Sequence, residues 1–156
     1  MIRLVAMDVD GTLTDGGIYM DGANGEFKRF NVHDGYGIVS LIKSGVEVAF
    51  ISGRASGPTD RRASDLGVTR VINGTEDKLA DLVAMADELG IAQSEVAFIG
   101  DDLPDIPCIK WSGIGIAVAD AHEEVLLSAD VTTVACGGGG AVREAADYIL
   151  RINSAI

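Results

Sequence analysis

The sequence predicts a doubly wound, Rossmann-like α/β domain with helices on both faces of a parallel sheet. The first observation is a repeated junction in which a helical stretch, a glycine and a short apolar run follow one another. It occurs at four glycines, Gly45, Gly67, Gly90 and Gly113. Glycine just past a helix is the usual left-handed cap, and short runs rich in Val and Ile predict buried strands. The second observation is that these strands alternate with helices, which favours a parallel sheet. The length of 156 residues fits one domain with a full core, so we expect a single domain over residues 1–156.

The predicted strands follow in a regular order. LVAM, residues 4–7, predicts the first strand, and the runs VEVAFIS, VTRVI, VAFIG and IGIAV predict the later ones. After the first strand, over about residues 16–35, two short β-type runs flank the turn sequence DGANG. This pattern predicts a β-hairpin insertion that projects over the strand ends.

Two helices carry an apolar stripe at helical spacing. The stripe before Gly90 consists of Leu79, Leu82, Val83, Ala86 and Leu89, and that of the last helix consists of Val142, Ala145, Ala146 and Ile149. We also expect His122 to start a helix, and Cys108 and Cys136 to be small packing residues.

Composition restricts the partners and the compartment. The formal net charge of −12 argues against nucleic acid or an anionic membrane as a partner, because both need a basic surface. Two cysteines are too few for a disulfide framework, which favours a reducing cytoplasm. The first residues, MIRLVAMD, reach Asp8 too early to form the apolar core of a signal peptide, and no apolar run approaches the ~18 residues of a membrane span. We therefore expect a cytoplasmic protein that acts on a small molecule.

Polar side chains follow four of the predicted strands. They are Asp8 and Asp10; then Ser52, Gly53 and Arg54; then Lys78; then Asp101, Asp102 and Asp105. A doubly wound topology brings the carboxyl ends of its strands to one edge of the sheet, so these groups should converge. Like charges at close range need a counter-cation, and hard oxygen ligands favour Mg²⁺ over zinc or copper. The sequence therefore predicts a magnesium site.

A magnesium ion among carboxylates, beside a lysine and a hydroxyl, suits phosphoryl transfer. Asp8 can attack phosphorus and form an aspartyl-phosphate that water then hydrolyses. Asp10 should point to the same side of an extended backbone, where it can protonate the leaving oxygen and later deprotonate the attacking water. Ser52 and Lys78 would bind the transferring group.

The motifs DVDGTLTDG, ISGR, the lysine of NGTEDK and GDDLPD stand in the order found in the haloacid dehalogenase superfamily of phosphatases, which the chain resembles over nearly its whole length. This resemblance implies that Asp8 is the nucleophile and a metal ligand. It implies that Asp10 is the acid/base, with a backbone carbonyl that also binds Mg²⁺, and that Asp101 is a further ligand. Ser52 and Lys78 would hold the phosphoryl group, and Asp105 would support the metal site through water or neighbours.

Four further segments, FNVHDGYGI, GRASGPTDRRASDLG, IAVADAHEEV and GGGGAVRE, are similar to one branch of that superfamily. The branch hydrolyses 3-deoxy-D-manno-octulosonate 8-phosphate, an acidic eight-carbon sugar phosphate of lipopolysaccharide biosynthesis. The resemblance implies a homotetramer without a large cap domain, in which a neighbouring subunit covers each site. It also implies a set of substrate-binding residues, namely Asn31, His33, Asp34, Gly35, Gly53, Arg54, Arg62 and Lys78.

Two departures from that branch bear on the substrate. His33 stands where the branch often has Arg, and Gly139 where it often has a basic residue. His33 can equally be a partly buried hairpin histidine. The run Gly137–Gly140 is either a flexible loop or an anion nest with Arg143 behind it as a further substrate contact.

Two other functions remain open. One is hydrolysis of a nine-carbon sialic-type ester, N-acylneuraminate or KDN 9-phosphate, by a close relative of the same branch. The other is a phospho-receiver switch domain, which also uses an acidic Mg²⁺ pocket, a hydroxyl and a lysine. A receiver should carry its phosphorylated Asp after a middle strand, where this chain has ISGR.

Overall fold

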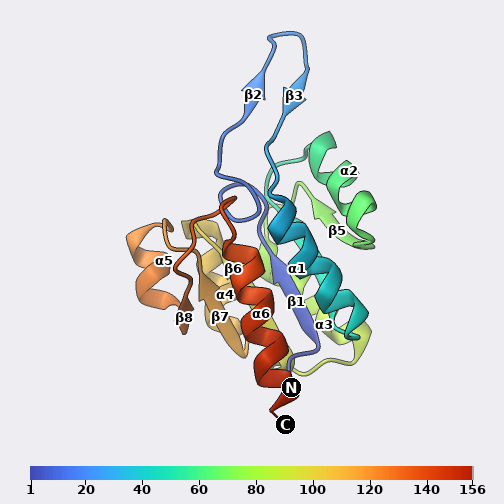
Figure 1. Ribbon diagram of the computed structural model, residues 1–156, viewed down its shortest axis with the longest axis vertical. Helices are drawn as coiled ribbons and strands as arrows, with labels where there is room; N and C mark the ends of the chain where they lie inside the picture. The colour runs from blue at the N-terminus through green and yellow to red at the C-terminus, as the bar shows by residue number, and fades with distance from the viewer. Residues whose placement is uncertain (156) are drawn as a thin grey trace.

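The computed structural model describes residues 1–155, and six parallel strands form its central sheet (Figure 1). Across the sheet the strands are β5 (Arg70–Asn73), β4 (Glu47–Ser52), β1 (Leu4–Met7), β6 (Val96–Gly100), β7 (Ile114–Ala117) and β8 (Val131–Thr132). The strands β1, β4 and β6 are almost entirely buried, as expected for a parallel sheet covered on both faces. The predicted doubly wound α/β fold is confirmed.

Residues 1–155 also form six α-helices and two 3₁₀ turns, of which all but the last helix lie between strands. They are α1 (Val32–Lys43), α2 (Gly57–Leu66), α3 (Lys78–Leu89), η1 (Gln93–Glu95), η2 (Leu103–Asp105), α4 (Ile106–Trp111), α5 (Glu123–Ser128) and α6 (Ala141–Ser154). Helices α1 and α6 pack side by side on one face of the sheet, and α3 and α4 pack together on the other (Figure 1). No helix among residues 1–155 is long and apolar enough to cross a membrane.

The core consists of the strand side chains and the apolar faces of these helices. Its largest fully buried members include Phe50, Phe98 and Met7, which come from the three central strands. The predicted stripe of α6 is buried at all four positions, and that of α3 is buried or partly buried and also includes Met85. The apolar periodicity of the sequence therefore located both faces correctly.

Glycine ends three of the helices as predicted, but not the fourth. Gly45, Gly67 and Gly90 have φ values of 80°, 76° and 62°, in the left-handed region that favours glycine. Gly113 does not have a positive φ, so its prediction as a left-handed cap is wrong. A Cβ at Gly113 would lie 2.5 Å from the carbonyl oxygen of Ser94, so close backbone approach is what requires glycine there.

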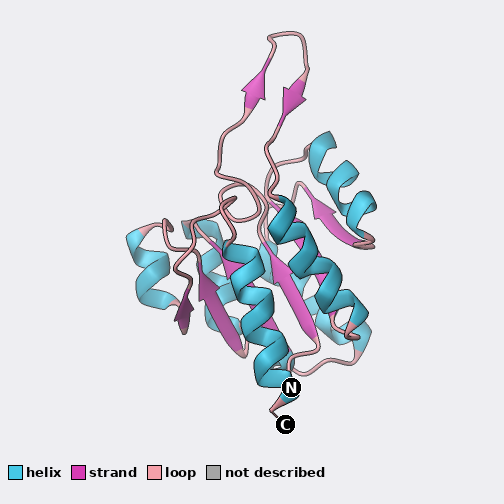
Figure 2. Ribbon diagram, in the orientation of Figure 1, coloured by secondary structure: helices cyan, strands magenta, loops and turns pink. Residues whose placement is uncertain are grey.

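The hairpin ends earlier in the chain than predicted. Strands β2 (Tyr19–Met20) and β3 (Glu26–Phe27) pair antiparallel and project beyond the carboxyl ends of the sheet strands (Figure 2). Asn31 is the N-cap of α1, and its side chain accepts a hydrogen bond from the backbone N–H of His33. The segment 31–35 therefore belongs to the helix start rather than to the hairpin. Strand β8 was not predicted, because two residues carry no periodic signal.

Candidate active site

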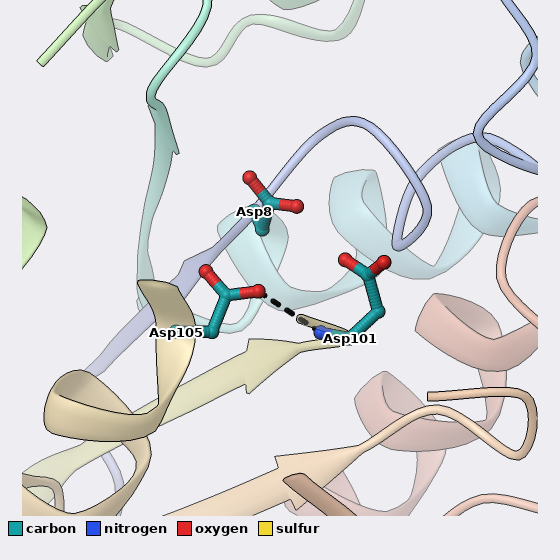
Figure 3. Close-up of side chains that lie close together, drawn as sticks. All are labelled: Asp8, Asp101 and Asp105. Atoms are coloured by element: carbon teal, nitrogen blue, oxygen red, sulfur yellow. Dashed lines mark hydrogen bonds between the residues drawn. The ribbon is translucent and has the colours of Figure 1, made fainter. Parts of the chain in front are cut away.

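Three carboxylates meet at the carboxyl ends of the central strands. Asp8 directly follows β1, Asp101 directly follows β6, and Asp105 ends the short turn η2. One carboxylate oxygen of each lies within 4.8 Å of the others, and Figure 3 shows the three groups around a common space. Topology explains the convergence: β1 lies between β4 and β6, and ligands in such sheets bind outside the carboxyl ends of the strands.

The backbone holds the carboxylate of Asp105 in a fixed orientation. Its Oδ2 accepts hydrogen bonds from the backbone N–H groups of Asp101, at 3.0 Å, and Asp102, at 3.2 Å; the first is the dashed line in Figure 3. Asp101 accepts a hydrogen bond of 3.0 Å from the hydroxyl of Thr12. Thr12 stands inside the DVDGTLTDG motif but was not among the predicted site residues.

Lys78, the first residue of α3, supplies the positive charge of the cluster. Its Nζ lies 2.6 Å from Oδ1 of Asp8 and 2.8 Å from Oδ1 of Asp105. Burial by itself would lower the pKa of Lys78, but the charges of Asp8 and Asp105 raise it above its ordinary value. The lysine is therefore an ammonium at neutral pH.

The cluster still carries more negative than positive charge. Burial, and then the charge of Asp105, raise the pKa of Asp8 well above its ordinary value, and burial also raises the pKa of Asp101. Three carboxylates with one ammonium leave a negative site made of hard oxygen donors. This donor set fits a divalent cation such as Mg²⁺. Asp8 and Asp101 are more accessible to the cation than Asp105, whose two oxygens already bind Lys78 and two backbone N–H groups.

The structure does not bring the carboxylate of Asp10 into this cluster. The backbone turns immediately after Asp8, and the carbonyl of Val9 accepts hydrogen bonds from the N–H groups of Thr12, Leu13 and Thr14. The expectation of an extended backbone at Asp10 is therefore wrong. The carboxylate of Asp10 instead forms a 2.7 Å ion pair with Lys28, a hairpin residue that the sequence analysis missed.

The segment after β4 lies beside Lys78. The Ser52 hydroxyl donates to the Arg54 carbonyl at 3.0 Å and accepts from the Arg54 N–H at 3.3 Å, so it shapes a tight turn. A Cβ at Gly53 would lie 3.8 Å from Cε of Lys78. A cavity of about 380 Å³ extends from Gly53 and Lys78 toward Pro104 and Pro107. The guanidinium of Arg54 pairs with Glu26 of β3.

Some of the predicted substrate residues at the start of α1 contact other parts of the protein. Arg62 of α2 donates from Nη2 to the carbonyl of Asn31 at 3.2 Å and stacks on Phe30 at 5.5 Å. The same Nη2 would lie 2.5 Å from a Cβ at Gly35, so this glycine makes room for the arginine. His33 is exposed, so its interpretation as a partly buried hairpin histidine is wrong.

A carboxylate of the same protein lies at the start of α6. The buried side chain of Asp34 accepts a 2.9 Å hydrogen bond from the backbone N–H of Arg143. Burial raises the pKa of Asp34 in spite of this bond. The interpretation of the run Gly137–Gly140 as an anion nest stays a prediction. The Arg143 side chain pairs with Asp147 at 2.9 Å and stacks on Tyr36.

Gly137 and Gly138 of that run pack tightly against the loop after β1. The N–H of Gly138 donates to the carbonyl of Thr12 at 3.2 Å, and the N–H of Gly137 donates to Asp120 at 2.9 Å. A Cβ at Gly137 would lie 1.8 Å from the carbonyl oxygen of Gly11. The interpretation of residues 137–140 as a flexible loop is therefore wrong. A larger cavity of about 580 Å³ lies elsewhere, against α6 and β8, and the chemistry described above does not extend to it.

Comparison with known proteins extends this picture. A model of the haloacid dehalogenase-like hydrolase family matches residues 59–143. The chain is 45% identical over 149 residues to 3-deoxy-D-manno-octulosonate 8-phosphate phosphatase of Escherichia coli strain K12, covering 96% of this chain and 79% of the relative. The corresponding protein of Yersinia pestis is 46% identical, covering 96% of this chain and 80% of the relative.

Two solved structures are similar throughout. The Moraxella catarrhalis 3-deoxy-D-manno-octulosonate 8-phosphate phosphatase, in complex with magnesium, phosphate and KDO, superposes with a TM-score of 0.94 at 45% identity, covering 96% of this chain and 86% of the other. The cobalt-bound deoxy-D-mannose-octulosonate 8-phosphate phosphatase of Haemophilus influenzae superposes with a TM-score of 0.94 at 40% identity, covering 98% and 90%. With the carboxylate cluster at the strand ends, these matches show that the chain belongs to the haloacid dehalogenase-like hydrolase family.

Proposed function

We propose that the chain is a Mg²⁺-dependent phosphomonoesterase that hydrolyses 3-deoxy-D-manno-octulosonate 8-phosphate through an aspartyl-phosphate intermediate. The observation that carries the chemistry is the buried cluster of Asp8, Asp101 and Asp105 around the ammonium of Lys78. The substrate assignment is supported by the relatives named above, at 45% and 46% identity over 96% of the chain.

The chain's own residues divide the reaction between them. A carboxylate oxygen of Asp8 attacks phosphorus, and the bond from phosphorus to the ester oxygen breaks with its electron pair remaining on that oxygen. The carboxyl group of Asp10 gives its proton to this oxygen, which releases the sugar alcohol. Water then attacks the aspartyl-phosphate and passes a proton to the carboxylate of Asp10, which releases inorganic phosphate and restores Asp8. Lys78 and Ser52 would hold the transferring group.

The metal would be held by Asp8, by Asp101 and by the backbone carbonyl of Asp10, with Asp105 fixing the geometry from behind. When bound, Mg²⁺ supplies charge neutralisation for the phosphoryl oxygens. Asp105 is suited to a supporting role because its oxygens already bind Lys78 and two backbone N–H groups.

Substrate recognition would use the cations and amides around the site. Arg54, which pairs with Glu26 of the hairpin, would exchange that partner for the sugar acid, and Asn31, His33, Gly35, Gly53 and Arg62 would complete the contacts. The substrate contacts first assigned to Asp34 and Arg143 fit less well, because Asp34 is buried against the backbone N–H of Arg143 and the Arg143 side chain pairs with Asp147 on its own helix.

The same proposal includes the assembly and the compartment. The hairpin exposes Tyr19, Met20 and Phe27, which suits contact with other copies in a homotetramer of cytoplasmic single-domain subunits. A two-stranded hairpin cannot by itself exclude water from the site, so a neighbouring subunit would complete the enclosure. Light scattering at assay concentration should give a mass near four subunits of 16.2 kDa, and a monomer would contradict this part of the proposal.

The nucleophile is tested by Asp8→Asn, which keeps an oxygen that can accept the hydrogen bond of Lys78. Phosphate release from the sugar ester should fall below about a thousandth of the wild-type rate. The matched control is Asp15→Asn, which removes a charge from an exposed position in the same loop and should leave the rate unchanged. Substantial residual turnover by Asp8→Asn would exclude Asp8 as the nucleophile.

The substrate is tested by comparing the eight-carbon ester with N-acylneuraminate and KDN 9-phosphates at the same Mg²⁺ concentration. A kcat/KM that is tenfold higher for a nine-carbon ester would replace the substrate named here and leave the chemistry standing.

A further inference from the structure

We propose that Lys28, next to the end of β3, is a positioning residue that holds the carboxyl group of Asp10 at the reacting ester. This inference rests on the proposed phosphatase function and adds a residue to it. It also gives the hairpin a task within its own subunit, in addition to any contact with a neighbour.

The burial of Lys28 is the first observation. Its side chain is 0% exposed, whereas lysine is almost never fully buried unless it is paired. Its Nζ lies 2.7 Å from Oδ1 of Asp10, whose side chain is 23% exposed. A buried ammonium is costly to desolvate unless a partner offsets that cost, so Lys28 and Asp10 constrain each other. The partly exposed Asp10 keeps access to a substrate, while the lysine is enclosed behind it.

The surroundings of Lys28 indicate a fixed position rather than a chance surface pair. Its Nζ also lies 3.4 Å from the hydroxyl of Thr59 on α2, so the ammonium is held from two sides. Two residues earlier on the same stretch, Glu26 pairs with Arg54, which follows the Ser52–Gly53 turn. The second half of the hairpin therefore contacts both the loop after β1 and the loop after β4.

The position of Asp10 explains why such a contact is needed. Asp10 lies in a turn, where neighbouring backbone does not direct its side chain as it would in a strand. Effective proton transfer requires the carboxyl group within hydrogen-bond reach of the ester oxygen. Lys28 restricts the carboxyl group to one orientation, and removing the ammonium would release it.

The chemistry of the leaving group separates this role from a general effect on folding. A sugar alkoxide must take up a proton as the bond from phosphorus to oxygen breaks, whereas p-nitrophenolate leaves without one. Loss of the positioned acid should therefore slow the first step, transfer of the phosphoryl group to Asp8, far more for the sugar phosphate than for p-nitrophenyl phosphate. The second step, in which Asp10 deprotonates water, is the same for both esters.

The experiment compares Lys28→Met and Lys28→Arg with the wild type on both esters. The rate measured is release of the leaving group in a single turnover, which reports the first step alone. We expect Lys28→Met to lower this rate for the sugar phosphate by about tenfold or more and for p-nitrophenyl phosphate by less than about threefold. Lys28→Arg keeps the charge and should recover most of the lost rate. Lys43→Met, at an exposed position of α1, is the matched control and should behave as the wild type. Circular dichroism and the thermal shift produced by MgCl₂ should be the same for all the variants.

Four outcomes overturn the proposal or its basis. An unchanged Lys28→Met enzyme, or one whose single-turnover release rates fall equally for both esters, overturns the positioning role. In an Asp10→Asn background, a further large loss from Lys28→Met also overturns it, because the two residues should act as one unit. Wild-type protein that hydrolyses neither ester overturns the proposed function instead. If Lys28→Met does not fold, Lys28→Gln removes the same charge and takes its place in each comparison.

Discussion

Replacing Asp101 with Asn tests two properties of the carboxylate cluster. The first is that repulsion among the carboxylates lowers the stability of the metal-free protein, and the second is that the cluster binds Mg²⁺. The variant removes one negative charge and keeps an Oδ1 that can accept the 3.0 Å hydrogen bond from Thr12. The metal-free variant should be more stable than the metal-free wild type, because Asp8 and Asp105 lose a like-charged neighbour. It should also lose the stabilisation that Mg²⁺ gives the wild type.

The size of the first effect follows from the distances. The carboxylate oxygens lie within 4.8 Å of one another, and two unit charges at that upper limit repel each other by about 3.5 kcal/mol at an effective dielectric constant of about 20. Partial exposure of Asp101 and its hydrogen bond reduce the observable gain to about 1–3 kcal/mol. For a domain of this length each kcal/mol changes Tm by about 2–4 °C, so an increase of several degrees is expected.

The second effect follows from linkage. A ligand at 100 times its Kd stabilises the folded state by about 2.7 kcal/mol, so MgCl₂ should raise the wild-type Tm by several degrees. The assay is thermal unfolding of chelator-treated protein, with and without MgCl₂, at one protein concentration. Asp102→Asn, at the exposed neighbouring position, is the control and should keep the full Mg²⁺ response. The reasoning is refuted by a metal-free Asp101→Asn protein less stable than the wild type, or by a Mg²⁺ response equal to that of the wild type.

Three further predictions concern groups outside the reacting cluster. Burial raises the pKa of the Cys108 thiol to about 12, while an unfolded thiol titrates near about 8.5. The folded state therefore keeps a proton that the unfolded state loses, so this thiol lowers stability as pH rises from about 8.5 toward 12, by up to about 1.4 kcal/mol per pH unit. Urea unfolding at pH 8 and pH 10 should show a smaller loss for Cys108→Ala than for the wild type. A thiol reagent at pH 8 should modify the exposed Cys136 in the folded protein and Cys108 only in urea; rapid modification of both thiols without urea would contradict the burial. Gly137→Ala should cost about 1–3 kcal/mol of stability, because its Cβ would overlap the carbonyl of Gly11. Gly139→Ala, whose Cβ would lie 3.3 Å from the nearest carbonyl oxygen, should cost much less, and equal losses for the two variants would contradict the packing described.

The fold was predictable because its signals are local. The buried runs of β1, β4 and β6 and the stripes of α3 and α6 are visible in single segments of sequence. Strand β8 escaped the prediction because two residues are too few to show a period. The role of Gly113 was predicted wrongly as a left-handed helix cap. In sequence, a glycine required by close backbone approach cannot be told from a glycine that ends a helix.

Part of the candidate site could be predicted from the sequence and part could not. The positions of Asp8, Lys78, Asp101 and Asp105 follow from parallel topology, which gathers strand ends whatever the details of the loops. The partners of Asp10 and Asp34 could not be predicted, because both residues lie in or beside loops whose path depends on distant packing. Their cationic and amide partners come from the hairpin and from the start of α6.

By itself, then, the sequence determined the sheet, the helices on both of its faces and the acidic edge, since each depends on the spacing of residues within one segment. Only the tertiary structure decided that Lys28 is buried against Asp10, that Asp34 accepts the backbone N–H of Arg143 in α6, and that Gly137 packs on Gly11. These contacts join residues 18, 109 and 126 positions apart, and each depends on whether both groups can be desolvated together, which no local pattern of side chains records.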